Sequence, residues 1–446
     1  MATNTAHLRR WNALRVLACG TALAAAITFF FGPSTSPVNR PGWMRTLDAD
    51  ESDLVGYAGH IPDSTKPKIT AFFPEQSYPV GGTAELQVDD TASQLSLQVL
   101  HAGADFTRVT AYDVMTGKPV TPLRSVGPVN GRRLISVRLG ANWPSGVYFV
   151  QLTAPGRRVG YAPFVLRPRR LGEHAVAIVI PTETWQAYNF RDDNGDGVPD
   201  TWYASGSTAR LARPFLNRGV PPHYKYYDCP FLRWAYLTHH DADYISDAEL
   251  NAVSGARLRK AYQLLIFEGH HEYVTEHEYD AVTDYRNLGG NLIFLSANNF
   301  FWKIKISGNV MTRVAKWRDL GRPEASLIGV EYYHNDMGQH RGPWIVRPPA
   351  ATLRWLLPDT GLRIGSNLSS GGIEADTTTP DSPRGTKIVA DIPDLFGDGR
   401  NADMTYYRTA GGAKVFAAGA FTLAGSVWEG DVRALMTNLW NWMAKN

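Results

Sequence analysis

Three short, mostly apolar runs constrain the fold of this chain more than any other feature. They lie at residues 175–180, 262–267 and 291–295, and polar residues follow each of them. A strand that is covered on both faces needs an almost uninterrupted apolar run, whereas a strand with one exposed face alternates apolar and polar residues. The three runs therefore predict the central strands of a parallel sheet that is covered by helices.

The segment between the second and third runs has the composition of a helix. It covers residues 276–288 and is followed by Gly289 and Gly290, the expected cap of a helix C-terminus. A strand, a helix and a second strand of these lengths predict a right-handed βαβ unit with parallel strands.

Two later segments extend the same pattern. Residues 415–419 predict a further strand, and residues 431–444 predict a terminal amphipathic helix. We therefore expect residues 171–446 to form an α/β domain of three layers with a mainly parallel sheet.

Residues 67–170 show a different, alternating pattern. Apolar and polar residues alternate in short stretches separated by turn residues such as Asn130-Gly131. These stretches lie at residues 68–73, 84–88, 95–100, 134–139 and 147–152. Period-two strands at this spacing predict an antiparallel β-sandwich of the immunoglobulin-like type. Nothing in it is typical of a catalytic site, so we expect a spacer or a binding platform.

The N-terminus has the pattern of an export segment. Three arginines within the first fifteen residues precede an apolar stretch at residues 16–31. This order is typical of a signal peptide or a signal anchor, and it predicts that the bulk of the chain lies outside the cytoplasmic membrane. We expect residues 1–32 to be a signal anchor, with a cleaved signal peptide of a secreted protein as the alternative. Residues 33–66, rich in Pro, Ser, Asp and Gly, are expected to be a linker.

Charge and cysteine content exclude some classes of function. The chain has 45 basic and 42 acidic residues and no long run of like charges, which argues against a nucleic-acid partner. Its two cysteines are Cys19, inside the apolar N-terminal stretch, and Cys229. A structural disulfide and a cysteine-rich zinc site are therefore not expected.

The polar residues that follow the three apolar runs predict the place of a functional site. Ligands of an open parallel sheet bind beyond the carboxyl ends of its strands. Residues 182–189 follow the first run, residues 269–273 (Gly-His-His-Glu-Tyr) the second, and Ser296, Asn298 and Asn299 the third. We expect hydroxyl, imidazole, carboxylate and amide groups from three strand ends to meet at one edge of the sheet.

Two common catalytic patterns do not fit this edge. A nucleophile elbow would place Ser or Cys directly after a strand, but residues 268–272 read Glu-Gly-His-His-Glu. The His-Glu-x-x-His pattern of zinc enzymes is not completed either, because Tyr273, Val274 and Thr275 follow Glu272. A metal ion held by carboxylate, phenolate or imidazole groups from separate strands remains open.

Four segments of this region carry a family resemblance. They are residues 181–189 (PTETWQAYN), 230–234 (PFLRW), 269–273 (GHHEY) and 289–302 (GGNLIFLSANNFFW). Together they resemble the C-terminal domain of the N,N-dimethylformamidase large (beta) subunit, over roughly residues 172–446. The resemblance implies an α/β fold similar to class I glutamine amidotransferases and flavodoxins, without a cysteine triad. It also implies that a small partner subunit can exist.

In that family the site is a mononuclear iron ion held by two tyrosines and one glutamate. By the resemblance, the glutamate matches Glu272 and one tyrosine matches Tyr188. For the second tyrosine Tyr227 is the first choice, with Tyr203 and Tyr226 as alternatives.

The same resemblance places His270, Asn298 and Glu374 among the catalytic groups near the iron. Ferric iron prefers anionic oxygen ligands, and as a Lewis acid it can polarise an amide carbonyl while Glu374 or His270 moves a proton. We therefore expect an iron-dependent hydrolase that acts on the C–N bond of a small amide outside the cytoplasmic membrane. The alternative is a non-catalytic envelope protein that keeps the fold and binds a carbohydrate or a protein.

Directly after Tyr188 the sequence departs from the family pattern. Asp192, Asn194, Asp196 and Asp200 have the spacing of a calcium-binding loop, with a glycine placed for the sharp turn. The full EF-hand loop is not completed, because no glutamate stands at its last position. We expect a short calcium loop of the kind found in extracellular proteins, with a solvated acidic turn as the alternative.

Overall fold

The structure is a computed structural model that describes residues 63–107, 109, 111–204, 206–421 and 423–445. The expected export segment, most of the expected linker and Cys19 lie outside the described residues, so these predictions stay predictions. In the described part of the chain, no helix has both the length and the apolar character needed to cross a membrane.

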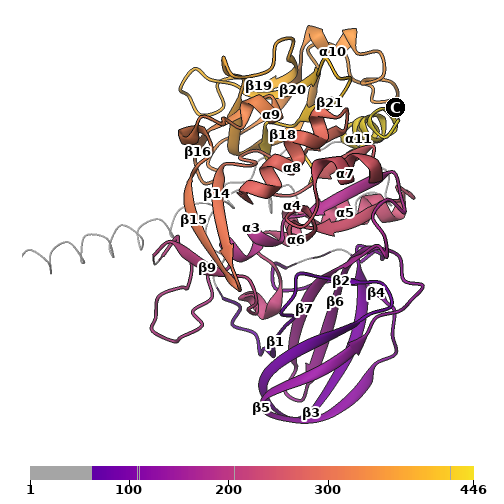
Figure 1. Ribbon diagram of the computed structural model, residues 1–446, viewed down its shortest axis with the longest axis vertical. Coiled ribbons are helices and arrows are strands. Elements are labelled where there is room, and N and C mark those ends of the chain that lie inside the picture. Colours follow the sequence, from indigo (N-terminus) through magenta and orange to yellow (C-terminus); the bar gives the residue numbers. More distant parts are fainter. Residues whose placement is uncertain (1–62, 108, 110, 205, 422, 446) are drawn as a thin grey trace, which may run out of the picture. The chain divides into compact units, whose positions relative to one another are not determined.

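The first sheet is built around one long strand, β3 (Figure 1). Its seven strands are β1 (Thr70–Phe72), β2 (Ser77–Pro79), β3 (Thr83–Ala102), β4 (Gly117–Pro119), β5 (Arg124–Arg138), β6 (Gly146–Ala154) and β7 (Arg158–Arg167). Strand β3 pairs antiparallel with β1, β4, β5 and β6, while β2 adds to β7 in parallel. All five expected stretches overlap these strands, and two of them, 84–88 and 95–100, belong to the single strand β3. The immunoglobulin-like type stays a prediction.

Alternation explains why β3 can cover a core with one face. Ala84, Leu86 and Val88 are buried, while Glu85 between them is exposed. Successive side chains of a strand point to opposite faces, so every second residue enters the apolar cluster of this sheet.

The second sheet contains eleven strands and has a parallel and an antiparallel part. The parallel part has the order β10 (Asp243–Ser246), β8 (Val176–Ile180), β11 (Leu264–Phe267), β13 (Asn291–Phe294) and β21 (Lys414–Ala417). The three apolar runs of the sequence are β8, β11 and β13, and every residue of these strands is buried.

The rest of the second sheet corrects the expectation of a mainly parallel sheet. Beyond β21 every pairing is antiparallel, so the sheet as a whole is mixed. These strands are β20 (Ala402–Arg408), β19 (Lys387–Ile392), β17 (Arg341–Val346), β18 (Asn367–Thr377), β16 (Glu331–Asn335) and β22 (Ala420–Phe421). They carry no apolar run, because buried polar residues such as Asp403 and Thr405 interrupt them. The glutamine amidotransferase-like or flavodoxin-like type stays a prediction.

The helices follow the sequence pattern closely where their ends are well capped. Residues 276–288 were expected to be helical, and α8 is Glu276–Asn287, which lies between the parallel strands β11 and β13. Thr275 and Glu278 form a capping box at its start, and Gly289 follows its end with a φ of 89°. The other α-helices are α3 (Thr182–Ala187), α4 (Tyr224–Tyr227), α5 (Cys229–Leu237), α6 (Asp247–Leu250), α7 (Gly255–Ala261), α9 (Ala325–Ile328), α10 (Pro348–Thr352) and α11 (Gly430–Met443).

A small third sheet lies beside the parallel strands. It has the order β12 (Tyr273–Thr275), β14 (Trp302–Ser307), β15 (Val310–Lys316) and β9 (Thr208–Arg210). The hairpin of β14 and β15 begins directly after the polar residues that follow β13, so it continues the edge on which the site was expected.

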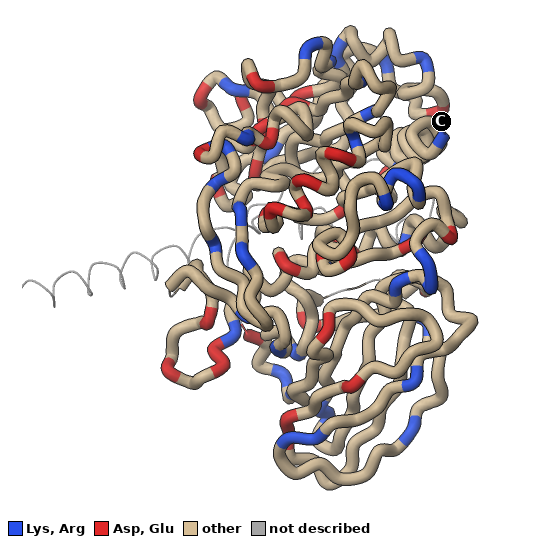
Figure 2. Tube along the Cα trace, in the orientation of Figure 1, with Lys and Arg blue, Asp and Glu red and all other residues tan. Residues whose placement is uncertain are grey.

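The boundary expected near residue 170 is not a break in packing. All described residues belong to one compact unit. One apolar cluster contains Phe149 and Val165 of the first sheet together with Val176 and Trp234 of the second part. The two parts therefore share a core. Acidic and basic residues are interspersed along both (Figure 2).

Candidate functional site

The carboxyl ends of β8, β11 and β13 meet at one edge of the second sheet, as expected. Ser296, which follows β13, donates a hydrogen bond of 2.8 Å from Oγ to the carbonyl oxygen of Gly269, which follows β11. Thr184, which follows β8, accepts a hydrogen bond of 3.2 Å at Oγ1 from the backbone N–H of Glu272. The segment that carries His270 and Glu272 is therefore tied to both neighbouring strand ends.

Helix α3 positions the first expected iron ligand, Tyr188. Asp247 fixes the start of this helix, because its Oδ2 accepts hydrogen bonds of 2.7 Å from the N–H of Glu183 and 3.1 Å from Oγ1 of Thr182. Tyr188 lies at the C-terminal end of the helix, and its phenol donates a hydrogen bond of 2.6 Å to Oε2 of Glu272. Two of the expected iron ligands are thus in direct contact.

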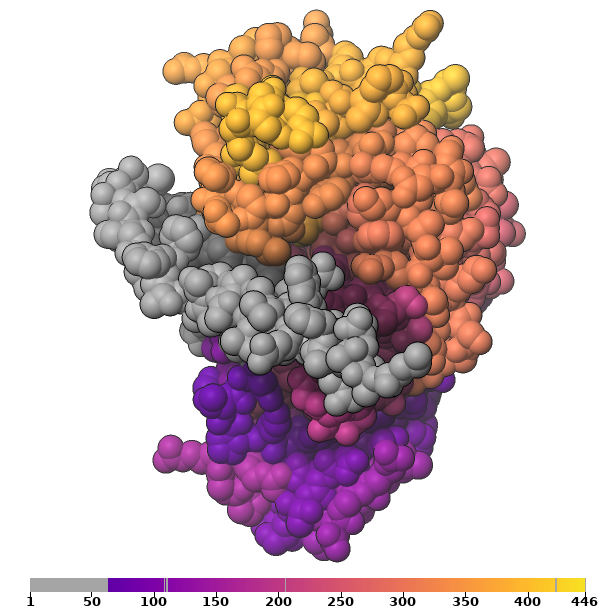
Figure 3. Space-filling view, turned by 90° about the vertical axis from the view of Figure 1, so that its left-hand side faces the viewer, coloured from indigo at the N-terminus to yellow at the C-terminus, as the bar shows by residue number. Residues whose placement is uncertain are grey.

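Two more tyrosines surround Glu272. The phenol of Tyr203 donates a hydrogen bond of 3.3 Å to the same Oε2 atom, and it is also hydrogen-bonded to the phenol of Tyr273. We call Glu272 and the three tyrosines around it, Tyr188, Tyr203 and Tyr273, the corner. Tyr273 is buried, whereas Tyr203 is 41% exposed, so the corner reaches the surface at Tyr203. In Figure 3 the magenta atoms of the chain near residue 200 lie in a hollow bordered by orange atoms of the chain after residue 300.

The geometry favours Tyr203 over Tyr227 as the second phenol beside Glu272. Tyr227, the first choice from the sequence, stacks on the rings of His223 and Phe421, with ring centroids 5.0 and 4.6 Å away. It lines a small cavity together with Tyr188 and His270. Tyr227 therefore lies near the site, and Tyr203, one of the two alternatives, hydrogen-bonds to the glutamate. No observation tests the assignment of an iron ligand.

His270 and Glu374 face the same corner from opposite parts of the second sheet. The Nε2 atom of His270 lies 3.7 Å from Oε2 of Glu272 and 3.6 Å from Oε2 of Glu374. Asn335 in the neighbouring strand β16 holds the other oxygen of Glu374 with a hydrogen bond of 2.7 Å. The expected catalytic groups are therefore close together, although about a hundred residues separate His270 from Glu374 in the sequence.

Irregular backbone aims two of these residues into the corner. Asn298 has a φ of 54°, a left-handed conformation that asparagine tolerates, and its N–H donates a hydrogen bond of 2.8 Å to Asp376. Ile373, directly before Glu374, has a φ of 69°, which is strained for a β-branched residue. The pairing of β18 with β22 also shifts register between Gly372 and Ala375. Such irregularities re-aim side chains and are common next to functional sites.

Burial disfavours the ionised forms of the carboxyl and phenol groups at this corner. Burial raises the pKa of Glu272 to about 7, although hydrogen bonds from Tyr188, Tyr273 and Tyr203 oppose the shift. Burial and the neighbouring Glu272 raise the pKa of Glu374 to about 8, which the Asn298 amide partly offsets. Burial also raises the pKa of the Tyr188 phenol. A cation at this corner would reverse these shifts, because it favours the ionised form of each oxygen.

The donors that meet at this corner fit a hard metal ion. Two phenol oxygens approach one oxygen of Glu272, and phenolate and carboxylate are the ligands that a ferric ion prefers. Groups of three or more His, Cys, Asp or Glu side chains that could hold a metal ion are not found in the described part of the chain. The expected iron site is of another kind, since tyrosines supply two of its three ligands.

Sequence reasoning missed several residues of the corner. Tyr273 was expected at the second strand end but was given no role, although a phenol next to an expected ligand was a usable signal. Asn335 and Asp376 carried no signal, because they reach the corner through the antiparallel strands β16 and β18, which the sequence did not reveal. Asp228 and Glu268 are also buried near the strand ends, and burial raises the pKa of Asp228 to about 8, a shift that its contacts with Trp185 and Glu268 oppose.

His271, to which the sequence assigned no role, points away from the corner. Its Nδ1 atom lies 3.8 Å from Oδ1 of Asp247, and its ring packs edge-on against Phe267. Asp247 is the residue that also holds the start of α3. His271 is therefore placed to support the packing between β11 and α3.

The expected calcium ligands all lie in one loop, which folds back on its own backbone. The carboxylate of Asp192 accepts hydrogen bonds of 2.7 and 2.8 Å from the N–H groups of Gly195 and Gly197. The side-chain amide of Asn194 donates hydrogen bonds of 3.2 Å to Asp196 and 3.5 Å to Asp200. These contacts describe an ordered acidic turn, and calcium binding stays a prediction.

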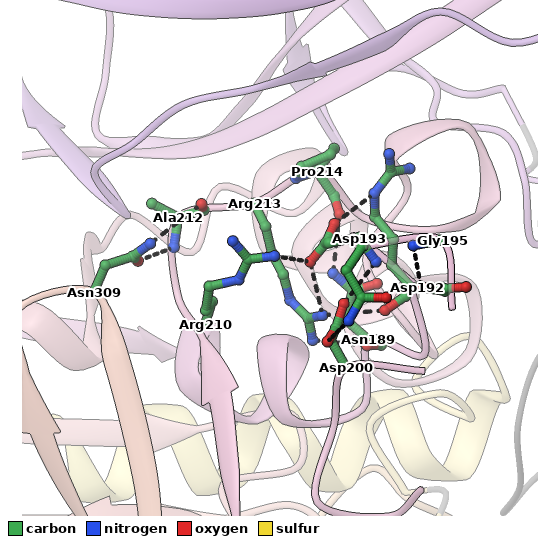
Figure 4. Close-up of polar contacts among 12 residues, drawn as sticks. Asn189, Asp192, Asp193, Gly195, Asp200, Arg210, Ala212, Arg213, Pro214 and Asn309 are labelled. Atoms are coloured by element: carbon green, nitrogen blue, oxygen red, sulfur yellow. Dashed lines mark hydrogen bonds and ion pairs between the residues drawn. The ribbon is translucent and has the colours of Figure 1, made fainter. Parts of the chain in front are cut away.

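Arginines anchor this loop through Asp193, which was not among the expected ligands (Figure 4). Arg191, Arg210 and Arg213 approach its carboxylate to 2.8, 2.9 and 3.3 Å. Arg213 is buried, and its guanidinium also donates a hydrogen bond of 2.7 Å to the carbonyl oxygen of Asn189, next to Tyr188. The loop and the end of α3 are thus held by the same side chain.

The fold and the site define an α/β protein whose strand ends form a buried, oxygen-rich corner suited to a hard metal ion. The family whose sequence model matches is described as N,N-dimethylformamidase beta subunit-like, C-terminal, and the match covers residues 130–431. The chain therefore belongs to this family, which confirms the resemblance found in the sequence. The match begins inside the first sheet, in β5, and so extends beyond the α/β part alone.

The relatives are distant. The N,N-dimethylformamidase beta subunit of an Alcaligenes species is 23% identical over 280 residues, which cover 49% of this chain and 37% of the relative. The match thus spans little more than a third of that relative's length.

Similar solved structures are remote as well. A superoxide reductase (neelaredoxin) from Ignicoccus hospitalis has a TM-score of 0.16 and 10% identity, and covers 23% of this chain and 81% of its own. A carbohydrate acetylesterase from Xanthomonas citri has a TM-score of 0.15 and 8% identity, over 50% of this chain and 58% of its own. These scores are too low to carry an argument about fold or function.

Proposed function

We propose that this chain is an amide hydrolase of the dimethylformamidase kind, which uses a mononuclear ferric ion to cleave the C–N bond of a small amide. The observation that carries the proposal is the approach of two phenols, from Tyr188 and Tyr203, to one oxygen of Glu272 in a member of this family. Tyr188, Glu272 and a second tyrosine would hold the ion. When bound, the ion supplies a Lewis acid that polarises the carbonyl group of the amide.

Hydrolysis needs one group that takes a proton and another that gives one. A bond forms between a water oxygen and the amide carbon, the C–N bond breaks, one proton leaves the water and one proton reaches the amine nitrogen. His270 suits the first task, because burial lowers its pKa well below the usual value and keeps the ring neutral. Its Nε2 atom has no hydrogen-bond partner among the described residues.

Glu374 suits the second task. It lies 3.6 Å from His270, and in the absence of a metal ion burial and Glu272 raise its pKa to about 8, which favours a form that can give a proton. After one turnover the proton on His270 can therefore return to Glu374 over a short distance. Asn298, whose amide favours the ionised form of both Glu272 and Glu374, would steady these carboxylates when they carry charge.

We also propose that the protein works outside the cytoplasmic membrane and that a small partner subunit joins it. The first point rests on the basic and apolar pattern of residues 1–32. The second is suggested by the name of the Alcaligenes relative, which is a beta subunit.

Iron analysis of the purified protein tests the metal. We expect about one iron per chain and a visible band from charge transfer between tyrosinate and iron. Tyr203→Phe should weaken or shift this band more than Tyr227→Phe or Tyr226→Phe, and the reverse order would move the second ligand to the helix α4. Colourless, iron-free protein after expression with ample iron would refute the metal-dependent proposal.

Release of dimethylamine from N,N-dimethylformamide, and of ammonia from acetamide and formamide, tests the reaction. His270→Gln and Glu374→Gln should each lower kcat while the iron content stays unchanged, because they remove proton transfer and not ligands. Iron-loaded protein that hydrolyses no small amide would contradict the proposed substrate class.

A further inference from the structure

Two small cavities with shared walls lie beside His270. The inner cavity is lined by Tyr188, His223, Asp228 and His270 among others, and has a volume of about 10 Å³. The outer cavity, lined by Phe190, Leu216, Asn217 and Val220 among others, also has a volume of about 10 Å³. A volume of about 10–15 Å³ holds one water molecule, and it is far too small for an amide with substituents.

Shared walls connect the cavities to each other and to the surface. Tyr188, Pro222 and His223 line both the inner and the outer cavity. Phe190 and Leu216 line both the outer cavity and a surface groove of about 330 Å³, whose wall includes Asp192 of the acidic loop. The inner cavity, the outer cavity and the surface groove are therefore separated from one another by these shared side chains.

Each cavity is lined by a residue that has an unpartnered buried polar atom. Among the residues that line the inner cavity, Oδ1 of Asp228 and Nε2 of His270 have no hydrogen-bond partner in the described part of the chain. Among those that line the outer cavity, Oδ1 of Asn217 has none. Asp228 is 1% exposed and Asn217 is 4% exposed, so bulk water does not reach them. A buried polar atom without a partner is costly, and an ordered water is the usual way to satisfy it.

We propose that the two cavities are water sites and that, with the groove, they form a route along which single water molecules reach His270. The inner water would bridge Asp228 and His270, and the outer water would bind Asn217. This role in catalysis rests on the proposed hydrolase function, because each turnover consumes one water next to His270. The substrate would use a different entrance, on the side where Tyr203 is exposed.

Val220 and Val165 offer a matched pair of variants. Val220 is buried against the outer cavity, so Val220→Ile adds one methylene group and fills a space of one water. Val165 is also buried and lines another cavity of about 40 Å³, which His270 does not line and which shares only Trp185 with the inner cavity. Val165→Ile is therefore the same change at a site outside the route.

Crystal structures of the full chain and of both variants, at a resolution that shows ordered surface waters, test the water sites. We expect one density peak in each cavity of the wild type and of Val165→Ile, and loss of the outer peak in Val220→Ile. Empty cavities in the wild type would overturn the proposal. These readouts need neither iron nor activity, so they remain decisive if the proposed hydrolase function fails.

Kinetics of amide hydrolysis test the supply of water. Val220→Ile should lower kcat about tenfold with an unchanged KM and unchanged iron content, while Val165→Ile should match the wild type. An unchanged kcat in Val220→Ile, with the outer water shown to be absent, would overturn the supply role.

Discussion

Replacing Glu272 by glutamine should have opposite effects on the iron-free and the iron-loaded protein. Glutamine keeps the shape of the side chain but cannot ionise. In the iron-loaded protein the change removes an anionic ligand, so iron should be lost. In the iron-free protein it removes a carboxyl group whose ionised form is costly in this buried corner.

The size of the second effect follows from the pKa of Glu272. Burial raises it from the ordinary 4.5 to about 7, and each pKa unit corresponds to about 1.4 kcal/mol. A carboxyl with a higher pKa in the folded protein binds its proton more tightly there, so the folded state loses stability as the pH rises from 4.5 to 7. The wild type should therefore lose about 3 kcal/mol between pH 4 and pH 8, a loss that Glu272→Gln should not share.

Urea unfolding of iron-free protein at pH 5 and pH 8 measures this effect. The variant also lacks the carboxylate acceptor of Tyr188, which lowers its unfolding free energy equally at both pH values. We therefore compare the difference in unfolding free energy between variant and wild type at pH 5 with the same difference at pH 8. We expect the variant to gain about 2 kcal/mol on the wild type from pH 5 to pH 8. Glu276→Gln, an exposed carboxyl nearby, is the control and should show no such gain. If the difference in unfolding free energy between Glu272→Gln and the wild type is the same at both pH values, burial does not raise the pKa of Glu272.

Three further predictions concern packing and the acidic loop. Gly269→Ala would place a Cβ atom 2.5 Å from Oδ1 of Asp228, so we expect a lower melting temperature and weaker iron binding, whereas Gly430→Ala, with free space around it, should cause neither. Asp193→Asn leaves the buried Arg213 without its carboxylate and should cost roughly 3 kcal/mol in urea unfolding, while Asp398→Asn, in an exposed ion pair, should cost much less. Calcium should raise the melting temperature and a chelator should lower it, an effect that Asp196→Ala should abolish; an unchanged melting temperature would leave the loop an acidic turn.

The parallel half of the second sheet could be predicted because its sequence is locally unambiguous. β8 and β11 are apolar throughout, β13 is apolar after Asn291, and α8 has both a capping box and a terminal glycine. Local pattern and final structure agree in these elements, so the parallel βαβ unit and the meeting of the strand ends could be predicted.

The antiparallel half could not be predicted because its burial is not encoded by apolar residues. Six of the seven residues of β20 are buried, yet they include Asp403 and Thr405. Asp403 is held by the Oγ1 atoms of Thr377 and Thr378 at 3.1 and 2.8 Å, partners that lie about 25 residues away in the chain. A polar residue that is satisfied only by distant partners reads as a loop residue in the sequence.

The same division explains which parts of the candidate site the sequence revealed. Glu272 and His270 follow a parallel strand, so position and resemblance pointed to the same residues. Glu374 came from resemblance alone, and its partner Asn335 faces it only because β16 and β18 pair in that register. The contact of Tyr203 with Glu272 could not be read from the sequence for a similar reason, since Tyr203 reaches Glu272 through an irregular segment between α3 and β9.

The parallel and the antiparallel half of the second sheet supply different groups to the corner. The parallel strand ends supply Glu272 and His270 on short segments that are hydrogen-bonded to their neighbours on both sides, so these groups are rigidly placed. The antiparallel half supplies Glu374 beside Ile373, whose strained φ persists only if the surrounding pairing enforces it. Changes in β16, β18 or β22 should therefore alter proton transfer by Glu374 and leave the expected iron ligands in place. In the proposed hydrolase, changes in the antiparallel half would thus alter the rate without rebuilding the contacts between Tyr188 and Glu272.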